Sequence, residues 1–481
     1  MPSAVGIRGV CQFNRDKVSR SAAAERTFFC PDPHMPLIKQ DAVSADTAWP
    51  DFDPQGESVQ PLLKKNMGRF FPASGSIDTR NEALLQWIQR RAAAGLWPYG
   101  LCAVEPPAVE CRVRHSCHQD VEGVNLTMVD YLGLSQDARL KAAAIEAIET
   151  FGLHLPSSGP LMGNTEMSYD LERSVARLFG RQDAFLLPTG WAAGFGAVSG
   201  VVRPGDHVLM DELSHQCLQQ GAYASTANVS VFRHLDNNHL ESQLVELRAK
   251  DPSSAILIIT EGLFSMDGDT PNLREVVALA RRFGAQTLVD IAHDFGCTGP
   301  SGTGTLGAQE LMNDIDIVVG SFSKSFGTNG GFISSRTLSM QWAQLCFAGP
   351  YTFSTAISPV QVAAAAVALQ IVTGPEGDVL RATLRERVAH ARDAAARRGL
   401  TVIGAPSPIV PVLIGREQHS RLAGMYSFRR GLIATCLEFP VVQRGTARYR
   451  LSMSPRLSNA QIDTAMDIVA DSIAEAKRAV D

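Results

Sequence analysis

One lysine stands among small hydroxyl residues and glycines, directly after an apolar run. The stretch "SFSKSFGTNGG" (321–331) places Lys324 just beyond the run "DIDIVVG" (314–320). If that run is a strand, the amine projects into a crevice at the strand's end, where it can form a Schiff base with an aldehyde. A surface lysine on a glycine-rich loop has the same local sequence, so Lys324 alone does not decide the chemistry.

An aspartate ends another apolar run. The stretch "LVDIAHDFG" supplies Asp290 and, three residues later, His293. A buried carboxylate that keeps a pyridine nitrogen protonated turns pyridoxal 5'-phosphate into an electron sink, and Asp290 is placed for that pairing. An aspartate that caps a helix is the alternative interpretation.

Three further runs end in residues that suit the same cofactor. The turn "LLPTGWAAG" offers Thr189, Gly190 and Trp191, where backbone N–H groups and a helix dipole favour a phosphate. His215 in "MDELSHQCLQQGA" could stack on a flat ring, and the hydroxyl of Ser265 in "EGLFSMDGD" is within reach of the same crevice. Taken singly, each has an ordinary alternative: a common α/β turn, a structural histidine and a turn-forming serine.

The elements that must position these residues follow an alternating pattern. From about residue 150 to 345, helix-like runs alternate with short β-branched runs that end in polar or glycine residues. This predicts an α/β unit with a largely parallel sheet, in which ligands lie at the carboxyl ends of the strands. Long helices and short strands such as "GLIATCLEF" then indicate a smaller α+β domain, whose last helix opens with a capping box at Ser458 and Gln461.

The signals come at successive strand ends, and longer motifs accompany them: "DYLGLS", "MGNTEMSYDLE", "FRHLD", "DIAHDFGCTGPSGTG" and "TARYRLSM". From about Tyr131 to Ser454 the chain resembles the α-oxoamine synthases, a family of fold type I pyridoxal-phosphate enzymes. The family includes serine palmitoyltransferase, 8-amino-7-oxononanoate synthase, 2-amino-3-ketobutyrate CoA ligase and aminolevulinate synthase. The resemblance implies a large domain with a mainly parallel seven-stranded sheet and a smaller α+β C-terminal domain.

The resemblance also implies roles around the cofactor ring. Lys324 resembles the Schiff-base lysine, and Asp290 resembles the partner of the pyridine nitrogen. His293 and Ser265 resemble the residues that hydrogen-bond the ring hydroxyl. His215 resembles the histidine that stacks on the cofactor face.

Further matches concern the cofactor phosphate and the substrate. Gly190, Trp191 and Ser321 resemble phosphate contacts, beside Thr189. Thr355 in "YTFSTA" resembles a residue that reaches a phosphate across a dimer interface. Arg450 matches the arginine that grips the substrate carboxylate, a role that suits a planar bidentate donor.

The implied reaction is the decarboxylative condensation of an amino acid with an acyl thioester, which gives an α-amino ketone. The thioester is either acyl-CoA or an acyl carrier protein. One alternative is a non-catalytic partner subunit, which should lack the lysine. The other is a different fold type I reaction, either transamination or retro-aldol cleavage, against which "FRHLD" and "TARYRL" argue without excluding it.

Four positions depart from the family pattern. Ile291 replaces a glutamate after the cofactor aspartate, and Val129 replaces an asparagine before "DYLG". Ser168 stands where a histidine is usual. Glu438 is the nearest match to an upstream arginine of 8-amino-7-oxononanoate synthase. We therefore expect a different substrate pocket and leave the amino acid and the acyl chain open.

Composition limits the partners and the cellular location that we expect for this protein. The 481 residues carry a net charge of −5 without long basic runs, which gives no electrostatic reason to expect a nucleic acid. No apolar run approaches the ~20 residues of a membrane span. Nine cysteines without a C-x-x-C pair suit reduced thiols, and the N-terminus lacks the order of a secretory signal, so a cytoplasmic location is expected.

The domain prediction has four parts. Residues 1–65 form an N-terminal extension, either a disordered tail or a docking surface for an acyl carrier protein. Residues 66–150 form an N-terminal segment, 151–357 the cofactor-binding large domain and 358–481 the small domain. Analogy with the family, whose active sites lie at the subunit interface, predicts a homodimer.

Overall fold

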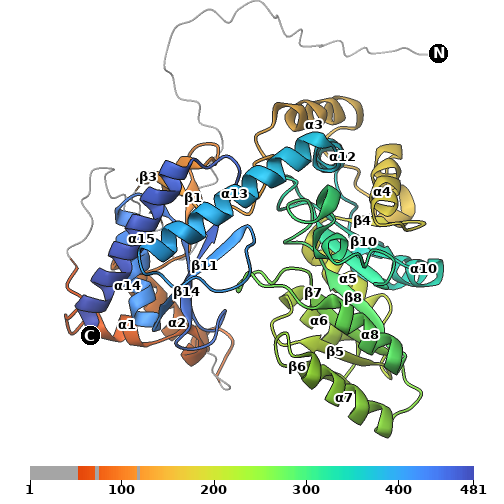
Figure 1. Cartoon of the computed structure of the whole chain (residues 1–481), viewed down its shortest axis with the longest axis horizontal. Helices are drawn as coiled ribbons and strands as arrows, with labels where there is room; N and C mark the ends of the chain where they lie inside the picture. Colours follow the sequence, from red (N-terminus) through yellow and green to blue (C-terminus); the bar gives the residue numbers. More distant parts are fainter. Residues whose placement is uncertain (1–51, 71–74, 116–119) are drawn as a thin grey trace, which may run out of the picture. The chain divides into compact units, whose positions relative to one another are not determined.

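A computed structural model of the chain describes residues 52–70, 75–115 and 120–481 (Figure 1). Residues 1–51, most of the predicted extension, lie outside the described ranges. The last residues of that extension form helix α1 (Gln60–Lys64), in which Leu62 and Leu63 are buried. The boundaries between the four predicted parts remain predictions.

Seven strands form the large sheet, in the order β4-β10-β9-β8-β7-β5-β6. They are β4 (Phe185–Leu187), β5 (His207–Asp211), β6 (Val229–Phe232), β7 (Ile256–Glu261), β8 (Gln286–Asp290), β9 (Ile317–Ser321) and β10 (Gly331–Ser335). The strands from β9 to β6 are parallel, whereas β10 runs antiparallel to both β9 and β4. The predicted fold class, a mainly parallel seven-stranded sheet, is confirmed.

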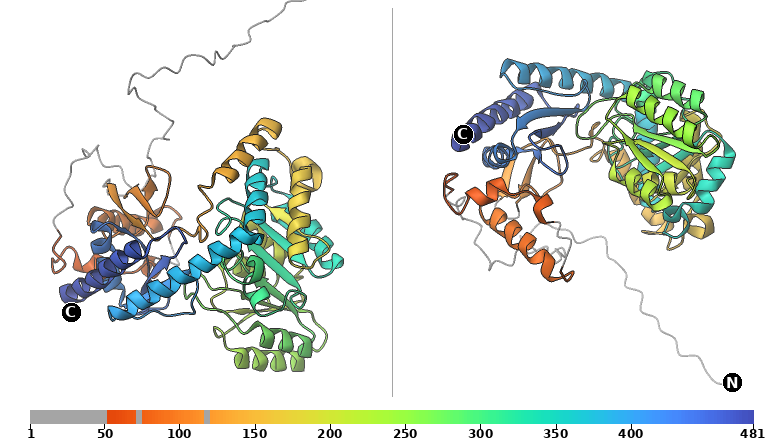
Figure 2. Two further views of the ribbon diagram at one scale, coloured as in Figure 1. Left: turned by 45° about the horizontal axis from the view of Figure 1, so that its top comes forward. Right: turned by 90° about the horizontal axis from the view of Figure 1, so that it is seen from below.

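Helices cover both faces of this sheet (Figure 2). Every residue of β7 and β9 is buried, as expected for strands that pack on two sides. One core cluster joins the sheet to α5 (Gly190–Ser199) and α6 (Gln216–Ser225), and another joins it to α7 (Asn237–Lys250) and α8 (Leu273–Phe283). The other α-helices between residues 138 and 373 are α3 (Ala138–Phe151), α4 (Glu166–Leu178), α9 (Gly304–Ala308), α10 (Leu338–Phe347), α11 (Gly349–Thr352) and α12 (Pro359–Thr373).

The start of α4 explains one departure from the family pattern. Thr165 Oγ1 accepts from the N–H of Ser168, and Ser168 Oγ accepts from the N–H of Thr165, which completes a capping box. Both side chains are buried. Ser168, where the family has histidine, therefore helps to cap the N-terminus of α4.

The smaller domain is built on a three-stranded antiparallel sheet. Its strands are β11 (Ile409–Gly415), β14 (Ala447–Ser452) and β13 (Thr435–Leu437), in that order. Three long helices accompany them: α13 (Pro375–Arg397), α14 (Glu417–Arg429) and α15 (Asn459–Val480). The predicted capping box at Ser458 and Gln461 is confirmed at the start of α15.

Residues before and within this domain share another sheet, which the sequence did not predict. It contains β1 (Cys102–Ala103), β2 (Glu110–Arg114), β3 (Asp120–Asn125) and the short β12 (Leu432–Ile433). The predicted strand "GLIATCLEF" is thus split, because β12 pairs with β3 and β13 pairs with β14. A Cβ at Gly123 would lie 1.8 Å from the carbonyl oxygen of Gly431, so this contact requires glycine.

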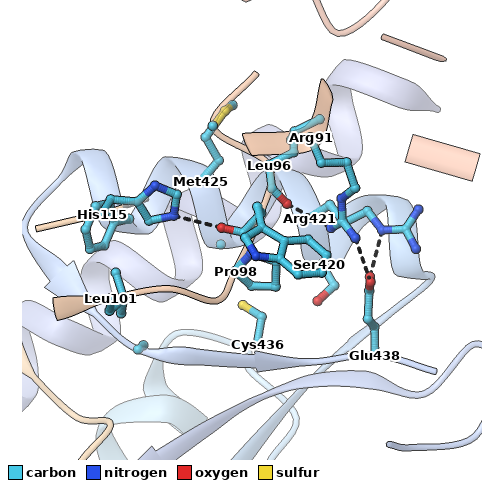
Figure 3. Close-up of a pocket in the computed structure, with 15 residues that line it drawn as sticks. Arg91, Leu96, Pro98, Leu101, His115, Ser420, Arg421, Met425, Cys436 and Glu438 are labelled. Atoms are coloured by element: carbon cyan, nitrogen blue, oxygen red, sulfur yellow. Dashed lines mark hydrogen bonds and ion pairs between the residues drawn. The ribbon is translucent and has the colours of Figure 1, made fainter. Parts of the chain in front are cut away.

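An ionic cluster joins α2 (Glu82–Ala93) to the small domain (Figure 3). Arg91 Nη1 lies 3.2 Å from Glu438 Oε1, and Arg421 Nε lies 2.7 Å from Glu438 Oε2. Arg421 also donates to the carbonyl of Leu62 in α1. All three charged side chains are buried, so Glu438, where a relative has arginine, is held between two guanidinium groups.

No helix within the described part of the chain is both long enough and apolar enough to cross a bilayer.

Candidate active site

The carboxyl ends of three neighbouring strands bring the central residues together. Asp290 at the end of β8 pairs in register with Glu261 on β7 and with Val319 on β9. Lys324 follows β9 by three residues and is half-buried. Burial lowers the pKa of Lys324 below its ordinary value, although the charges of Asp290 and Glu261 oppose this. A lowered pKa favours the neutral amine, which is the nucleophilic form.

The glycines after Lys324 are needed for close packing. Gly327 has a φ of +64°, and a Cβ there would lie 2.4 Å from the backbone nitrogen of Ser135. The lysine loop therefore packs directly on the segment that carries the motif "DYLGLS". This is why the lysine stands among small residues.

Asp290 is buried, and its orientation is fixed by the chain that follows it. Its Oδ1 accepts a hydrogen bond from the N–H of Ala292 at 2.8 Å. The neighbouring Ile291 is fully buried and its N–H donates to the carbonyl of Val319. Ile291 therefore belongs to the core, and the difference from the family's glutamate adds no charge there.

The start of α5 offers the donor set of a phosphate site. Thr189 caps the helix, since its Oγ1 accepts from the N–H of Ala192 at 3.0 Å. The N–H groups of Gly190 and Trp191 lie at the open end of the helix, where they have no partner within it. A Cβ at Gly190 would lie 2.5 Å from Ser321 Oγ, so the helix end and the end of β9 are in close contact. Backbone amides and a hydroxyl in this arrangement fit the phosphate of pyridoxal phosphate.

His215 is held at the start of α6 by a residue that the sequence analysis did not assign. Its backbone N–H donates to Glu261 Oε1 at 2.6 Å, and its Nδ1 accepts from the N–H of Cys217. Burial lowers the pKa of its imidazole below the ordinary value, and the charge of Asp290 opposes this shift. Burial, followed by the charge of Asp290, raises the pKa of Glu261 well above its ordinary value.

A second unassigned residue, Tyr131, joins the predicted ring contact to the predicted substrate arginine. Its hydroxyl lies 2.9 Å from His293 Nδ1 and accepts from Arg450 Nη2 at 3.0 Å. Arg450 Nε donates to the carbonyl of Ser265 at 2.6 Å. The structure therefore brings Arg450, His293 and Ser265 together, although Arg450 lies in the small domain.

Thr355 is the exception among the predicted residues. Its side chain is exposed, and no contact with the other predicted site residues is found within the described part of the chain. The next residue, Ala356, donates its N–H to the carbonyl of Ser157 at 3.0 Å. The contact of Thr355 with a second copy stays a prediction.

Glu438, in contrast, is not free to bind a substrate. Both of its carboxylate oxygens are paired with guanidinium groups, those of Arg91 and Arg421 (Figure 3). The pocket beside this cluster also has Trp97 and His115 in its lining. His115 Nε2 lies 2.7 Å from the carbonyl oxygen of Trp97.

Comparison with known proteins agrees with this geometry. A sequence model of the family described as "Aminotransferase class I and II" matches residues 121–469. The chain belongs to this family. It is 35% identical over 347 residues to an 8-amino-7-oxononanoate synthase of Thermoanaerobacter pseudethanolicus. The aligned region covers 72% of this chain and 86% of that protein.

Solved structures show which members of this family the chain is similar to. A structure of SPT with the PLP internal aldimine matches with a TM-score of 0.78 at 27% identity, over 84% of this chain and 100% of that one. The serine palmitoyltransferase of Sphingomonas wittichii matches equally well, with a TM-score of 0.78 at 25% identity and the same coverage. Within the wider family the chain is an α-oxoamine synthase, a pyridoxal-phosphate-dependent acyltransferase. The interpretation as a non-catalytic partner subunit is therefore set aside.

Proposed function

We propose that this enzyme condenses an amino acid with an acyl thioester and releases carbon dioxide and a thiol, giving an α-amino ketone. The observation that carries the proposal is the meeting of Lys324, Asp290 and His293 at one sheet edge with Arg450 from the small domain. A transaminase or a retro-aldol lyase could use the first three residues. The similarity to 8-amino-7-oxononanoate synthase and serine palmitoyltransferase favours condensation.

Pyridoxal phosphate, bound through Lys324, supplies an electron sink for negative charge at the amino acid's Cα. Asp290 would hold the pyridine nitrogen, and the start of α5 would hold the phosphate. His293 and Ser265 would contact the ring hydroxyl, and His215 would cover one ring face.

The remaining steps belong to the protein. Arg450 orients the amino acid through its carboxylate by charge-assisted hydrogen bonds. Once released, the amine of Lys324 can take the proton from Cα, because burial lowers its pKa and so favours the neutral amine, which is the basic form. The charge of Arg450 then stays close to the carboxylate that leaves as carbon dioxide.

The experiment that tests this function is a titration of the visible absorption of the holoenzyme with glycine, alanine, serine and other amino acids. Cα proton exchange in deuterated water and carbon dioxide release on adding an acyl-CoA follow for each amino acid that binds. We expect one amino acid to shift the band, exchange its proton and release carbon dioxide only with the thioester. Proton exchange without thioester-dependent carbon dioxide release would favour another fold type I reaction.

The proposal includes a homodimer with shared active sites. It is supported by three exposed apolar side chains near Thr355: Leu161 (80% exposed), Met162 (77%) and Phe353 (89%). The segments that carry them are joined by the hydrogen bond from Ala356 to Ser157. Apolar groups of this size suit a surface covered by a second copy, across which Thr355 would reach the cofactor phosphate.

An acyl carrier protein as donor and a cytoplasmic location complete the proposal. The six cysteines of the described ranges are all free thiols, which supports a reducing compartment. Carrier docking is tested by removing residues 1–51, because a cut after residue 65 would also delete α1. A rise in KM for the acyl carrier but not for acyl-CoA is expected, and equal kinetics would remove the docking role.

A further inference from the structure

The hydroxyl of Tyr131 lies between a guanidinium and an imidazole, and the direction of each hydrogen bond can be assigned from its partners. A guanidinium has donors and no acceptor, so the hydroxyl oxygen accepts from Arg450 Nη2 at 3.0 Å. The oxygen has a second lone pair, but the buried hydroxyl proton has no other acceptor among the described residues, so the hydroxyl is assigned as the donor to His293 Nδ1, 2.9 Å away. The hydrogen bonds therefore run from Arg450 through Tyr131 to His293, an arrangement that we call the tyrosine relay.

This direction decides where His293 carries its proton. A ring nitrogen that accepts has no hydrogen, so Nδ1 is bare and Nε2 holds the proton of the neutral ring. The ring is neutral because burial, followed by the charges of Lys324, Arg450 and His215, holds the pKa of His293 well below its ordinary value. Burial also raises the pKa of Tyr131 to about 12, which keeps its hydroxyl protonated.

The three side chains of the tyrosine relay are buried, and one donor group of Arg450 makes only a long contact. Tyr131 is fully buried, and Arg450 and His293 are 7% and 8% exposed. Hydrogen bonds in such surroundings polarise one another more strongly than in water. Arg450 Nη1 lies 3.5 Å from Ser452 Oγ, a long contact that an incoming carboxylate can replace.

We propose that Tyr131 is a positioning residue that couples carboxylate binding at Arg450 to the position of the proton on His293. The inference rests on the proposed function, because it takes Arg450 as the site of the amino acid's carboxylate. A carboxylate paired with Arg450 offsets the positive charge that acts on Tyr131 and His293. Both groups then hold their protons more tightly. Substrate binding at Arg450 therefore changes the proton affinity of His293, the residue placed to contact the cofactor's ring hydroxyl.

The test uses propionate, a carboxylate without the amine needed to react with the cofactor. The visible band of the holoenzyme is titrated against pH with and without saturating propionate. In the wild-type protein we expect the midpoint to move to higher pH. In Tyr131→Phe, which keeps the ring and loses the hydroxyl, propionate should still bind while the shift falls by more than half.

Tyr449→Phe is the matched control. Tyr449 precedes Arg450 on β14, is also fully buried, and faces the opposite side of the strand. Its loss of a hydroxyl should leave the propionate shift unchanged. A shift that persists in full in Tyr131→Phe overturns the coupling alone, whereas no shift in the wild type overturns both the coupling and the carboxylate role of Arg450.

A measurement on the unaltered holoenzyme tests the tyrosine relay directly. In protein labelled with 15N-histidine, His293 is assigned by the signal that disappears in His293→Asn. We expect a neutral ring with Nδ1 unprotonated. A ring protonated at Nδ1 would overturn the tyrosine relay.

Discussion

The amine of Lys324 is surrounded by protein atoms and by the charges of Asp290 and Glu261. Lys324→Ala should abolish both the visible band and turnover, because no other described lysine lies at this sheet edge. Absorption spectra and product assays check this outcome. Lys250→Ala removes an exposed lysine of α7 that pairs with Glu246, and it should change neither. A band retained in Lys324→Ala would contradict the central assignment.

Arg450 carries the second prediction at this scale. Arg450→Ala should weaken amino-acid binding by about 1.5–3 kcal/mol, the range for hydrogen bonds to a charged group. Arg450→Lys keeps the charge and loses the planar fork, so its effect should be intermediate. Spectral titration gives the affinities. Equal affinity in wild type and Arg450→Ala would place the carboxylate elsewhere.

Most residues of the candidate site could be proposed from the sequence because they follow strand ends along the chain. Lys324, Asp290 and His293 are recognisable from an apolar run and the residues after it. Tyr131 and Glu261 lay within motifs that were recognised, but their roles were missed. Tyr131 bonds to His293, 162 residues away, and Glu261 bonds to the backbone of His215, 46 residues away. No periodicity in a single sequence reports such contacts.

Between the strands, His234 holds the loop that carries Ser265. Its Nδ1 lies 2.8 Å from Asp211 Oδ1 at the end of β5, and its Nε2 lies 3.1 Å from Asp269 Oδ2 in the loop after β7. Burial lowers the pKa of His234, but hydrogen bonds and charges from the two carboxylates outweigh it and raise the pKa to about 10. The imidazolium therefore fastens the loop to β5.

The sign of this shift predicts a pH dependence of stability. Because the folded pKa is raised, the stabilisation is complete below the ordinary value of 6.5 and is lost as pH rises through about 10. His234→Gln should lower the free energy of unfolding by about 1.5–3 kcal/mol at pH 6. Urea unfolding of the wild type and the variant, at pH values from about 6 to about 10.5, measures this difference in free energy. A variant with the wild-type pH profile would contradict the role of His234.

Elements were predictable where they are long and apolar. The parallel strands that end at Asp211, Glu261, Asp290 and Ser321 are fully buried over most of their length, so they read as apolar runs. The short strands β6 and β10 were missed, and β10 follows a glycine-rich loop. The sheet of β1, β2, β3 and β12 was missed because β12 has two residues and pairs with a strand far away in the chain.

At the scale of the whole molecule, the prediction concerns assembly. Phe353→Asp should convert the proposed dimer into monomers and weaken cofactor binding, because it places a charge in the apolar surface beside Thr355. Sedimentation velocity and spectral titration with pyridoxal phosphate measure the two effects. Ile77→Asp is the control, since Ile77 is 77% exposed in the N-terminal segment and should leave the dimer intact. A dimeric Phe353→Asp would place the interface elsewhere.

The ionic cluster around Glu438 limits how this enzyme could be converted into one of its relatives. Glu438→Arg alone would not recreate the arginine of 8-amino-7-oxononanoate synthase, because it would bury three guanidinium groups together without a carboxylate. Changes at Arg91 and Arg421 would have to accompany it, and Arg91 lies before the region that the family model matches. The effect of a substitution at position 438 therefore depends on a segment outside the matched region, so this position cannot be exchanged alone.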